Sequence, residues 1–258
     1  MSMNLMEHLQ PHVIIPLKIG GIDISITNAV IMMWIACILV FFTLTLAGRI
    51  GRLIPKGLQN LMESLVSFVK QSLIHEILGE EGMSWFPFIA TLFFFILFCN
   101  LLGLIPIPKI GFTATSNINV TASLAAVVFI CTQGAGIAKH GLVGYGKTFV
   151  PKGMPRGIMG GILIGFMIIV EIISQLARPF SLAVRLFANM TAGHMVILVF
   201  ISMIFMFQGV IAKIFVTPVS VVMAVVMMAF EIFVSLLQAF IFAILASIYI
   251  SLSVHPEH

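Results

Sequence analysis

Charged side chains are scarce in this chain. Asp, Glu, Lys and Arg make up 9% of its 258 residues, whereas soluble globular proteins carry about 25%. Hydrophobic residues make up 60%, and the mean hydropathy is +1.19. This composition excludes a soluble domain and predicts an integral membrane protein. The net charge of +4 is scattered among the loops, so it indicates membrane topology and argues against nucleic-acid binding.

Cysteines and nucleotide-binding motifs are also sparse. The three cysteines, Cys37, Cys99 and Cys131, lie within apolar runs and have no CxxC spacing, so we interpret them as small hydrophobic side chains. The GxxxxGK[ST] motif is absent, so nucleotide chemistry is expected only in partner subunits. We expect no metal or cofactor and no ATP catalysis by this chain alone. Residues 1–13 lack the features of a secretory signal peptide, and we expect no cleavage.

Apolar stretches occupy most of the sequence. Three of them, roughly residues 24–47, 85–105 and 118–138, are each long enough at about 1.5 Å per residue to cross a hydrocarbon core of about 30 Å. Residues 57–78 place Leu, Phe and Val at helical spacing between Gln, Glu and Lys. They predict an amphipathic helix on the membrane surface, ended by the Gly-Glu-Glu-Gly of residues 79–82.

Basic residues alternate between the loops. The loop after the second stretch opens with a Pro-Ile-Pro break at 106–108 and carries one cation, Lys109. The segments after the first and third stretches carry four each: Arg49, Arg52, Lys56 and Lys70, then Lys139, Lys147, Lys152 and Arg156. By the positive-inside rule the N-terminus lies outside and, after five crossings, the C-terminus lies in the cytoplasm.

The last two apolar stretches, residues 161–207 and 213–252, are too long for ordinary spans. As continuous helices they would measure about 70 Å and about 60 Å. Either each is broken into two spans, or both are long, steeply tilted helices packed as a hairpin with a joint around 208–213. Residues 163–189 contain no loop chemistry beyond Pro179, which favours the hairpin.

Ionisable side chains interrupt the first of these long stretches. Glu171, Arg178 and Arg185 are seven residues apart, so at about 100° per residue they form one stripe. Asn189 lies near that stripe, whereas His194 lies on roughly the opposite face. Each ionisable group at membrane depth costs roughly 2.5–3.5 kcal/mol on insertion scales, and such groups mark ion pathways. Arg185 cannot lose its charge, so its role must be electrostatic.

The final stretch adds a second polar face. Glu231, Ser235 and Gln238 follow the i, i+4, i+7 spacing of one helix face. If Glu231 meets His194, the two form an acid–imidazole pair suited to proton relay.

Structural alternatives exist for several of these side chains. Asn189, Ser235 and Gln238 are also typical of interhelical hydrogen bonds. Arg178 is better explained by an interfacial position or a pair with Glu171 than by direct chemistry.

Three segments resemble the a subunit of F-type ATP synthases: ARPFSLAVRLFANMTAGH (177–194), LLQAFIFAILASIYIS (236–251) and, more weakly, TSNINVT (115–121). The order and spacing of the apolar stretches agree over nearly the whole chain. Gly103 is a departure, since some members carry an acid there, and we assign it no channel role.

The resemblance implies roles by position. Arg185 would be the stator arginine that faces the c-ring carboxylates and separates two half-channels. Asn189 and Gln238 would be its polar neighbours at the rotor. His194 and Glu231 would relay protons on the outer side, an arrangement that part of the family shows with acid and histidine exchanged. Glu171 would line the cytoplasmic half-channel.

We therefore predict an all-α membrane protein with about three ordinary transmembrane helices, a surface helix and a long hairpin facing the c-ring. It forms one domain: an outer segment (1–23), peripheral helices (24–156), the ion-translocating hairpin (157–252) and a tail (253–258). The expected function is proton translocation in the Fo sector. The expected partners are the c-ring, peripheral-stalk b subunits, the F1 sector indirectly and the lipid of a bacterial inner membrane. The alternative is a self-contained secondary transporter in which Arg185 binds an anion.

Overall fold

The computed structural model describes residues 12–19, 22–23, 25–50, 55–105, 112–148, 158–207 and 209–255. Five of its helices are long and apolar enough to cross a membrane: α1 (Asn28–Ile50), α3 (Phe86–Gly103), α4 (Ile118–Thr148), α5 (Ile158–Met206) and α6 (Val210–Val254). The prediction of an all-α membrane protein is confirmed. Several predicted features lie outside the described residues: the segment 1–11, the 106–108 break, the tail residues 256–258, and the cations Arg52, Lys109, Lys152 and Arg156.

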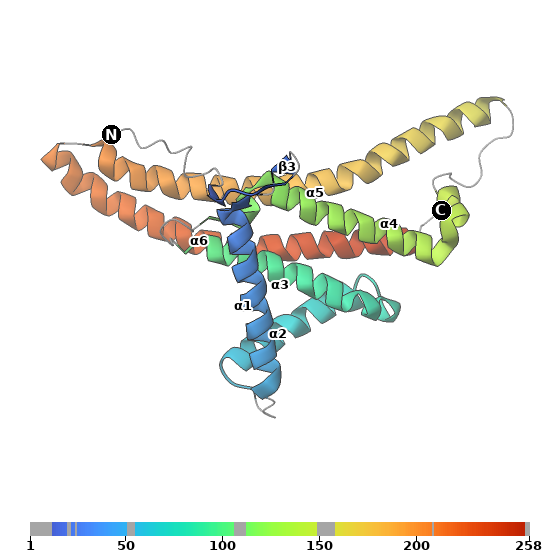
Figure 1. The fold of residues 1–258 in the computed structure, drawn as a ribbon, viewed down its shortest axis with the longest axis horizontal. Coiled ribbons are helices and arrows are strands. Elements are labelled where there is room, and N and C mark those ends of the chain that lie inside the picture. The colour runs from blue at the N-terminus through green and yellow to red at the C-terminus, as the bar shows by residue number, and fades with distance from the viewer. Residues whose placement is uncertain are drawn as a thin grey trace.

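Helices α5 and α6 form one long hairpin. They contain 49 and 45 residues, which corresponds to about 74 Å and about 68 Å. Pro179 and Pro218 lie inside them without ending either helix, so the alternative of four shorter spans is wrong. Helix α6 begins at Val210 and already contains Lys213, so the joint is shorter than predicted. In Figure 1 the hairpin runs along the longest axis of the molecule, and α1 lies crosswise to it.

The core lies where α3, α4, α5 and α6 meet. Small residues on α6, among them Ala239, Ala243 and Ala246, are fully buried and let the neighbouring helices approach closely. Phe93 of α3 and Phe242 of α6 fill the same cluster and are also fully buried. This packing holds α5 against α6 and α4 against both, so the polar residues of three helices have fixed neighbours.

Helix α4 extends ten residues beyond the predicted end at 138. Gly141 adopts a left-handed backbone with φ of 71°, and the helix kinks there, which glycine permits at low cost. The ring of His140 reaches the carbonyl oxygen of Val254 at 3.0 Å. Hydropathy falls after residue 138, so it could not show that a polar helical segment packs against the end of α6.

The predicted surface helix is continuous but changes from α-helical to π-helical winding. An α-helix, α2 (Leu58–Val69), continues as a π-helical turn, η2 (Lys70–His75), and a 3-10 helix, η3 (Glu80–Trp85), follows the Gly79 turn. The wider π turn changes the helical phase, and the adjacent Leu73 and Ile74 are both fully buried. Leu61 and Phe68 remain exposed, so the amphipathic character is as predicted, and the helix ends at His75, three residues before the predicted end.

The segment before α1 forms two short antiparallel ladders that the sequence interpretation missed. Strand β1 (Val13–Ile15) pairs with β4 (Ile26–Thr27), and β2 (Lys18–Ile19) pairs with β3 (Ile22–Asp23). The run of Val and Ile before Gly20-Gly21 was an available hairpin signal. A short 3-10 helix, η4 (Ala114–Ser116), packs against α3, α4 and α5 and becomes important below.

Candidate functional site

The α5–α6 hairpin brings polar side chains together at three levels. Because the helices are antiparallel, the start of the polar segment of α5 lies beside the end of α6. The three pairs, in order along α5, are Arg178 with Tyr249, Asn189 with Gln238, and His194 with Glu231. Arg185 lies between the first and second pairs, about 21 Å from Glu171 and about 13 Å from His194 along the axis.

The predicted acid–imidazole pair exists. His194 Nδ1 lies 3.6 Å from Glu231 Oε1, and Glu231 is 3% exposed. Neither Glu231 oxygen has a hydrogen-bond partner among the described residues. Gly193 provides the space for this carboxyl group, because a Cβ there would lie 2.6 Å from the same oxygen. The arrangement allows a proton to pass between a buried acid and a half-buried imidazole.

Thr113 completes this level of the site. Its hydroxyl contacts His194 Nε2 and leaves Nδ1 directed at Glu231. The residue comes from the extended segment before η4, just ahead of the 115–121 match, and the sequence interpretation missed it. A Cβ on Gly103 would overlap the Thr113 side chain, which explains physically why an acidic residue is not accommodated at that position here.

A second buried polar contact lies beside Thr113. The Thr115 hydroxyl donates to Asn100 Oδ1 at 2.6 Å, and both residues are fully buried. Asn100 Nδ2 has no hydrogen-bond partner within the described part of the chain. Helix η4 therefore carries polar groups between α3 and the His194 level.

At the middle level, Asn189 Nδ2 donates to Gln238 Oε1 at 2.7 Å. Gln238 and Ser235 are buried on the face that Glu231 shares, so the predicted i, i+4, i+7 face is confirmed. Asn189 itself is partly open to the exterior. This contact fits both the interhelical alternative and a role at a partner surface.

Arg185 points away from this chain. Its residue is exposed, and the guanidinium makes no hydrogen bond or ion pair with any residue that the structure describes. Apolar side chains of the hairpin are exposed near it, including Val184 on α5 and Leu237 on α6. A permanent cation is thus presented on a largely apolar surface.

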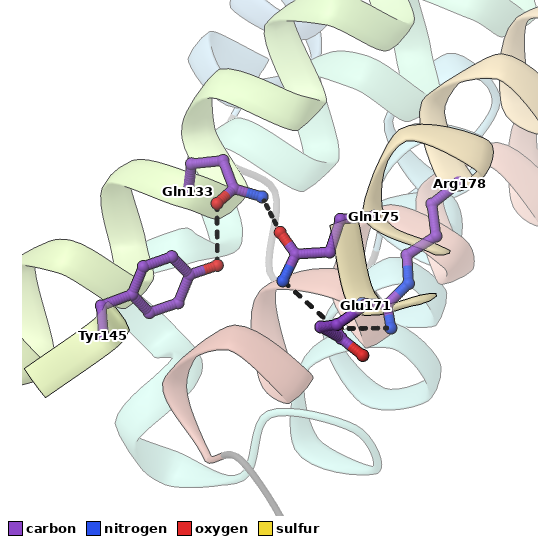
Figure 2. A network of polar contacts seen from close by, with 5 residues as sticks. All are labelled: Gln133, Tyr145, Glu171, Gln175 and Arg178. Carbon is purple, nitrogen blue, oxygen red and sulfur yellow. Dashed lines mark hydrogen bonds and ion pairs between the residues drawn. The ribbon is translucent and has the colours of Figure 1, made fainter. Parts of the chain in front are cut away.

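The level of Arg178 lies in the N-terminal half of α5, and Figure 2 shows its contacts around Glu171. Arg178 lies 3.9 Å from Glu171 Oε1 and sits over the ring of Tyr249, 5.7 Å from its centroid. The predicted Arg178–Glu171 pair is present, and the Glu171 side chain is 36% exposed. Gln175 of α5 extends this cluster to Gln133 and Tyr145 of α4 through hydrogen bonds. The sequence alone did not predict that these three residues belong to the site. Within the described residues, no group of three or more His, Cys, Asp or Glu could hold a metal.

Comparison with known proteins identifies the family. The family model described as ATP synthase A chain matches residues 30–251. The chain belongs to the ATP synthase A chain family. Relatives called ATP synthase subunit a are 42% identical in Magnetococcus marinus, 38% in Paramagnetospirillum magneticum and 41% in Hyphomonas neptunium. These alignments cover 98%, 98% and 93% of this chain and 94%, 98% and 92% of the relatives.

Membership of this family agrees with the resemblance seen in residues 115–121, 177–194 and 236–251. The matched residues 30–251 include all three levels of the hairpin. ATP synthesis and proton transport follow from the family.

Proposed function

We propose that this chain is the stationary proton-translocating subunit of the Fo sector, and that Arg185 couples proton flow to rotation of a c-ring. The observation that carries this proposal is the placement of one permanent cation on an outward face, between two buried or half-buried polar clusters. The family of the chain and the names of its relatives agree with it.

The exposed guanidinium requires a partner in the membrane. An arginine facing lipid costs at least about 2.5–3.5 kcal/mol, whereas a carboxylate at about 4 Å would attract it by about 4 kcal/mol at an effective dielectric near 20. A rotor that presents successive carboxylates to the α5–α6 face supplies that partner. Asn189, one turn away and exposed, then borders the same rotor surface, and the buried Gln238 holds it from behind.

Protons enter from the outer side through the His194–Glu231 pair and neutralise a rotor carboxylate. The neutral carboxyl group can turn into lipid, where the charged form is costly. It returns at the Glu171 level and releases its proton toward the cytoplasm. Arg185 separates the two half-channels because its charge repels a proton crossing directly. Each proton contributes about 2.3 kcal/mol per 100 mV, so a few protons suffice to overcome the attraction between Arg185 and a carboxylate.

The transporter alternative is less well supported. Such transporters typically bind their substrate at the midplane between broken helices. Here α5 and α6 are continuous, and Arg185 lies on an exposed face rather than in a cavity. Peripheral-stalk b subunits, and the F1 sector through them, complete the proposed set of partners. The N-terminus faces outward and the C-terminus faces the cytoplasm of a bacterial inner membrane.

The test uses inverted vesicles that carry the assembled complex with Arg185→Ala. ATP-driven proton pumping should be lost, and passive proton permeability should rise, because no charge then separates the half-channels. Arg49→Ala is the matched control, since Arg49 is an exposed arginine at the end of α1, and it should pump normally. Coupled pumping that survives in Arg185→Ala, with the complex assembled, would overturn the proposal.

A further inference from the structure

A chain of hydrogen bonds links helix α4 to Glu171 on α5. The Tyr145 hydroxyl lies 2.8 Å from Gln133 Oε1, and Gln133 Nε2 lies 2.7 Å from Gln175 Oε1. Gln175 Nε2 in turn lies 3.3 Å from Glu171 Oε1. Figure 2 shows the three contacts in sequence, with Arg178 approaching Glu171 from the other side. Polar side chains from two helices therefore converge on one carboxyl group.

The ionised carboxylate determines the direction of this chain. A carboxylate only accepts hydrogen bonds, so Gln175 must offer its amide NH₂ group to Glu171. The Gln175 oxygen is then left to accept from Gln133, and the Gln133 oxygen accepts from the phenol of Tyr145. Every donor points toward Glu171. A hydroxyl can donate or accept, so Tyr145 is the one member that can end the chain in either direction.

We propose that Gln175, Gln133 and Tyr145 are positioning residues that stabilise the ionised form of Glu171 and reverse their donation when it binds a proton. This inference rests on the proposed role of Glu171 in the cytoplasmic half-channel. A protonated Glu171 can donate to the Gln175 oxygen. Both amides then turn over, and Gln133 donates to the Tyr145 oxygen. The same four side chains thus satisfy both charge states of Glu171.

The chain does not itself carry protons toward α4. Amide groups neither gain nor lose a proton near neutral pH, and the cavity beside Gln133 and Gln175 measures about 10 Å³, which is at the limit for one water molecule. Glu171, by contrast, is 36% exposed, so its proton exchanges on that open side.

Among the described residues, contacts link Glu171 to Arg178 directly and to two tyrosines through other side chains. Arg178 lies at 3.9 Å on the same helix, Tyr145 reaches it from α4 through the two glutamines, and Tyr249 of α6 lies against Arg178. Arg178 supplies a positive charge 3.9 Å from the carboxyl group. The amide chain supplies the donor that orients it, and the two contributions are separable by mutation.

The experiment measures passive proton conduction through the membrane sector against cytoplasmic pH, in vesicles of the assembled complex after F1 removal. Gln175→Leu should move the pH midpoint upward, because the protonated Glu171 persists when a donor to its charged form is lost. The lost hydrogen bond is stronger to the charged carboxylate than its reversed counterpart is to the neutral acid, and the partial exposure of Glu171 weakens both. We therefore expect a shift of about one pH unit.

Gln133→Leu and Tyr145→Phe should shift the midpoint in the same direction by successively less. Combining Gln133→Leu with Gln175→Leu should add nothing to Gln175→Leu, because the residues act in series. In a Glu171→Gln background no variant should move the midpoint, since no carboxylate remains. Gln71→Leu is the control, because Gln71 is an exposed glutamine on η2.

An unchanged midpoint in assembled Gln175→Leu would overturn the inference, as would a shift that persists with Glu171→Gln. If Gln175→Leu does not assemble, Tyr145→Phe decides the matter, because it removes a single oxygen atom. Retained pumping in Arg185→Ala would instead refute the proposed function. The two failures are therefore distinguishable.

Discussion

Exchange of His194 and Glu231 is a direct test of the outer half-channel. The single variants His194→Glu and Glu231→His each place two groups of like character where an acid and an imidazole now lie 3.6 Å apart. The double variant restores one acid and one imidazole, with their helices reversed. Proton relay requires the pair and not its order, so we expect both single variants to lose function and the double variant to regain it.

The magnitude follows from the separation. At 3.6 Å, a fully charged pair would interact by about 4.6 kcal/mol at an effective dielectric near 20, and this is an upper bound because His194 carries charge only when protonated. In the single variants an attraction of at most this size is replaced by repulsion or lost. If side-chain movement relieves half of 4.6 kcal/mol, the remaining 2.3 kcal/mol or so corresponds to a rate about 50-fold lower.

The assay is ATP-driven acidification of inverted vesicles, with the amount of assembled complex measured in the same membranes. The double variant should pump at least about tenfold faster than the slower single variant, a difference of about 1.4 kcal/mol in the barrier. Gly193 adjoins Glu231 and limits the space for a ring at 231, so full recovery is not expected. A double variant no faster than its slower parent, despite normal assembly, would refute the reasoning.

Three further outcomes are expected. Gly193→Ala should destabilise the assembled hairpin by about 1–3 kcal/mol, because its Cβ would press on the buried carboxyl group of Glu231. The measurement is the unfolding temperature in detergent, which should fall. An unchanged unfolding temperature would contradict the close approach of the two residues. Asn189→Leu and Gln238→Leu should slow pumping by similar factors and be non-additive when combined, because each removes the same 2.7 Å hydrogen bond; simple additivity would show that the contact is unimportant. Gly103→Asp should impair pumping, because the Cβ of residue 103 overlaps the Thr113 Cβ as well as its hydroxyl. Adding Thr113→Ser should not restore pumping, since serine keeps both of these atoms. Normal pumping in Gly103→Asp would show that the segment around Thr113 can move aside.

Helical periodicity accounts for the parts of the site that were predictable. The spacing of Glu231, Ser235 and Gln238 placed them on one face of α6 before any partner was known, and all three are buried on that face. The contact between His194 and Glu231 does not follow from the spacing, because spacing within one helix does not determine its register against another. The register of the hairpin decides that contact.

The missed residues share a physical reason. Thr113 lies in an extended segment without helical spacing. Gln133 lies in an apolar stretch whose length indicates a membrane span but not a site. Neither residue has a local pattern that indicates its partner. Thr113 contacts His194, 81 positions away, and Gln133 contacts Gln175, 42 positions away. Contacts over such separations arise from the packing of whole helices.

The sequence by itself determined the membrane class, the five apolar helices and the set of ionisable residues on the hairpin. These properties depend on composition and on the 3.6-residue period, which are local. Only the tertiary structure decided that Arg185 faces outward, that Thr113 contacts His194, and that α4 contributes to the Glu171 cluster. Those outcomes depend on which faces of distant helices pack together, and in an apolar helix many faces are compatible with burial.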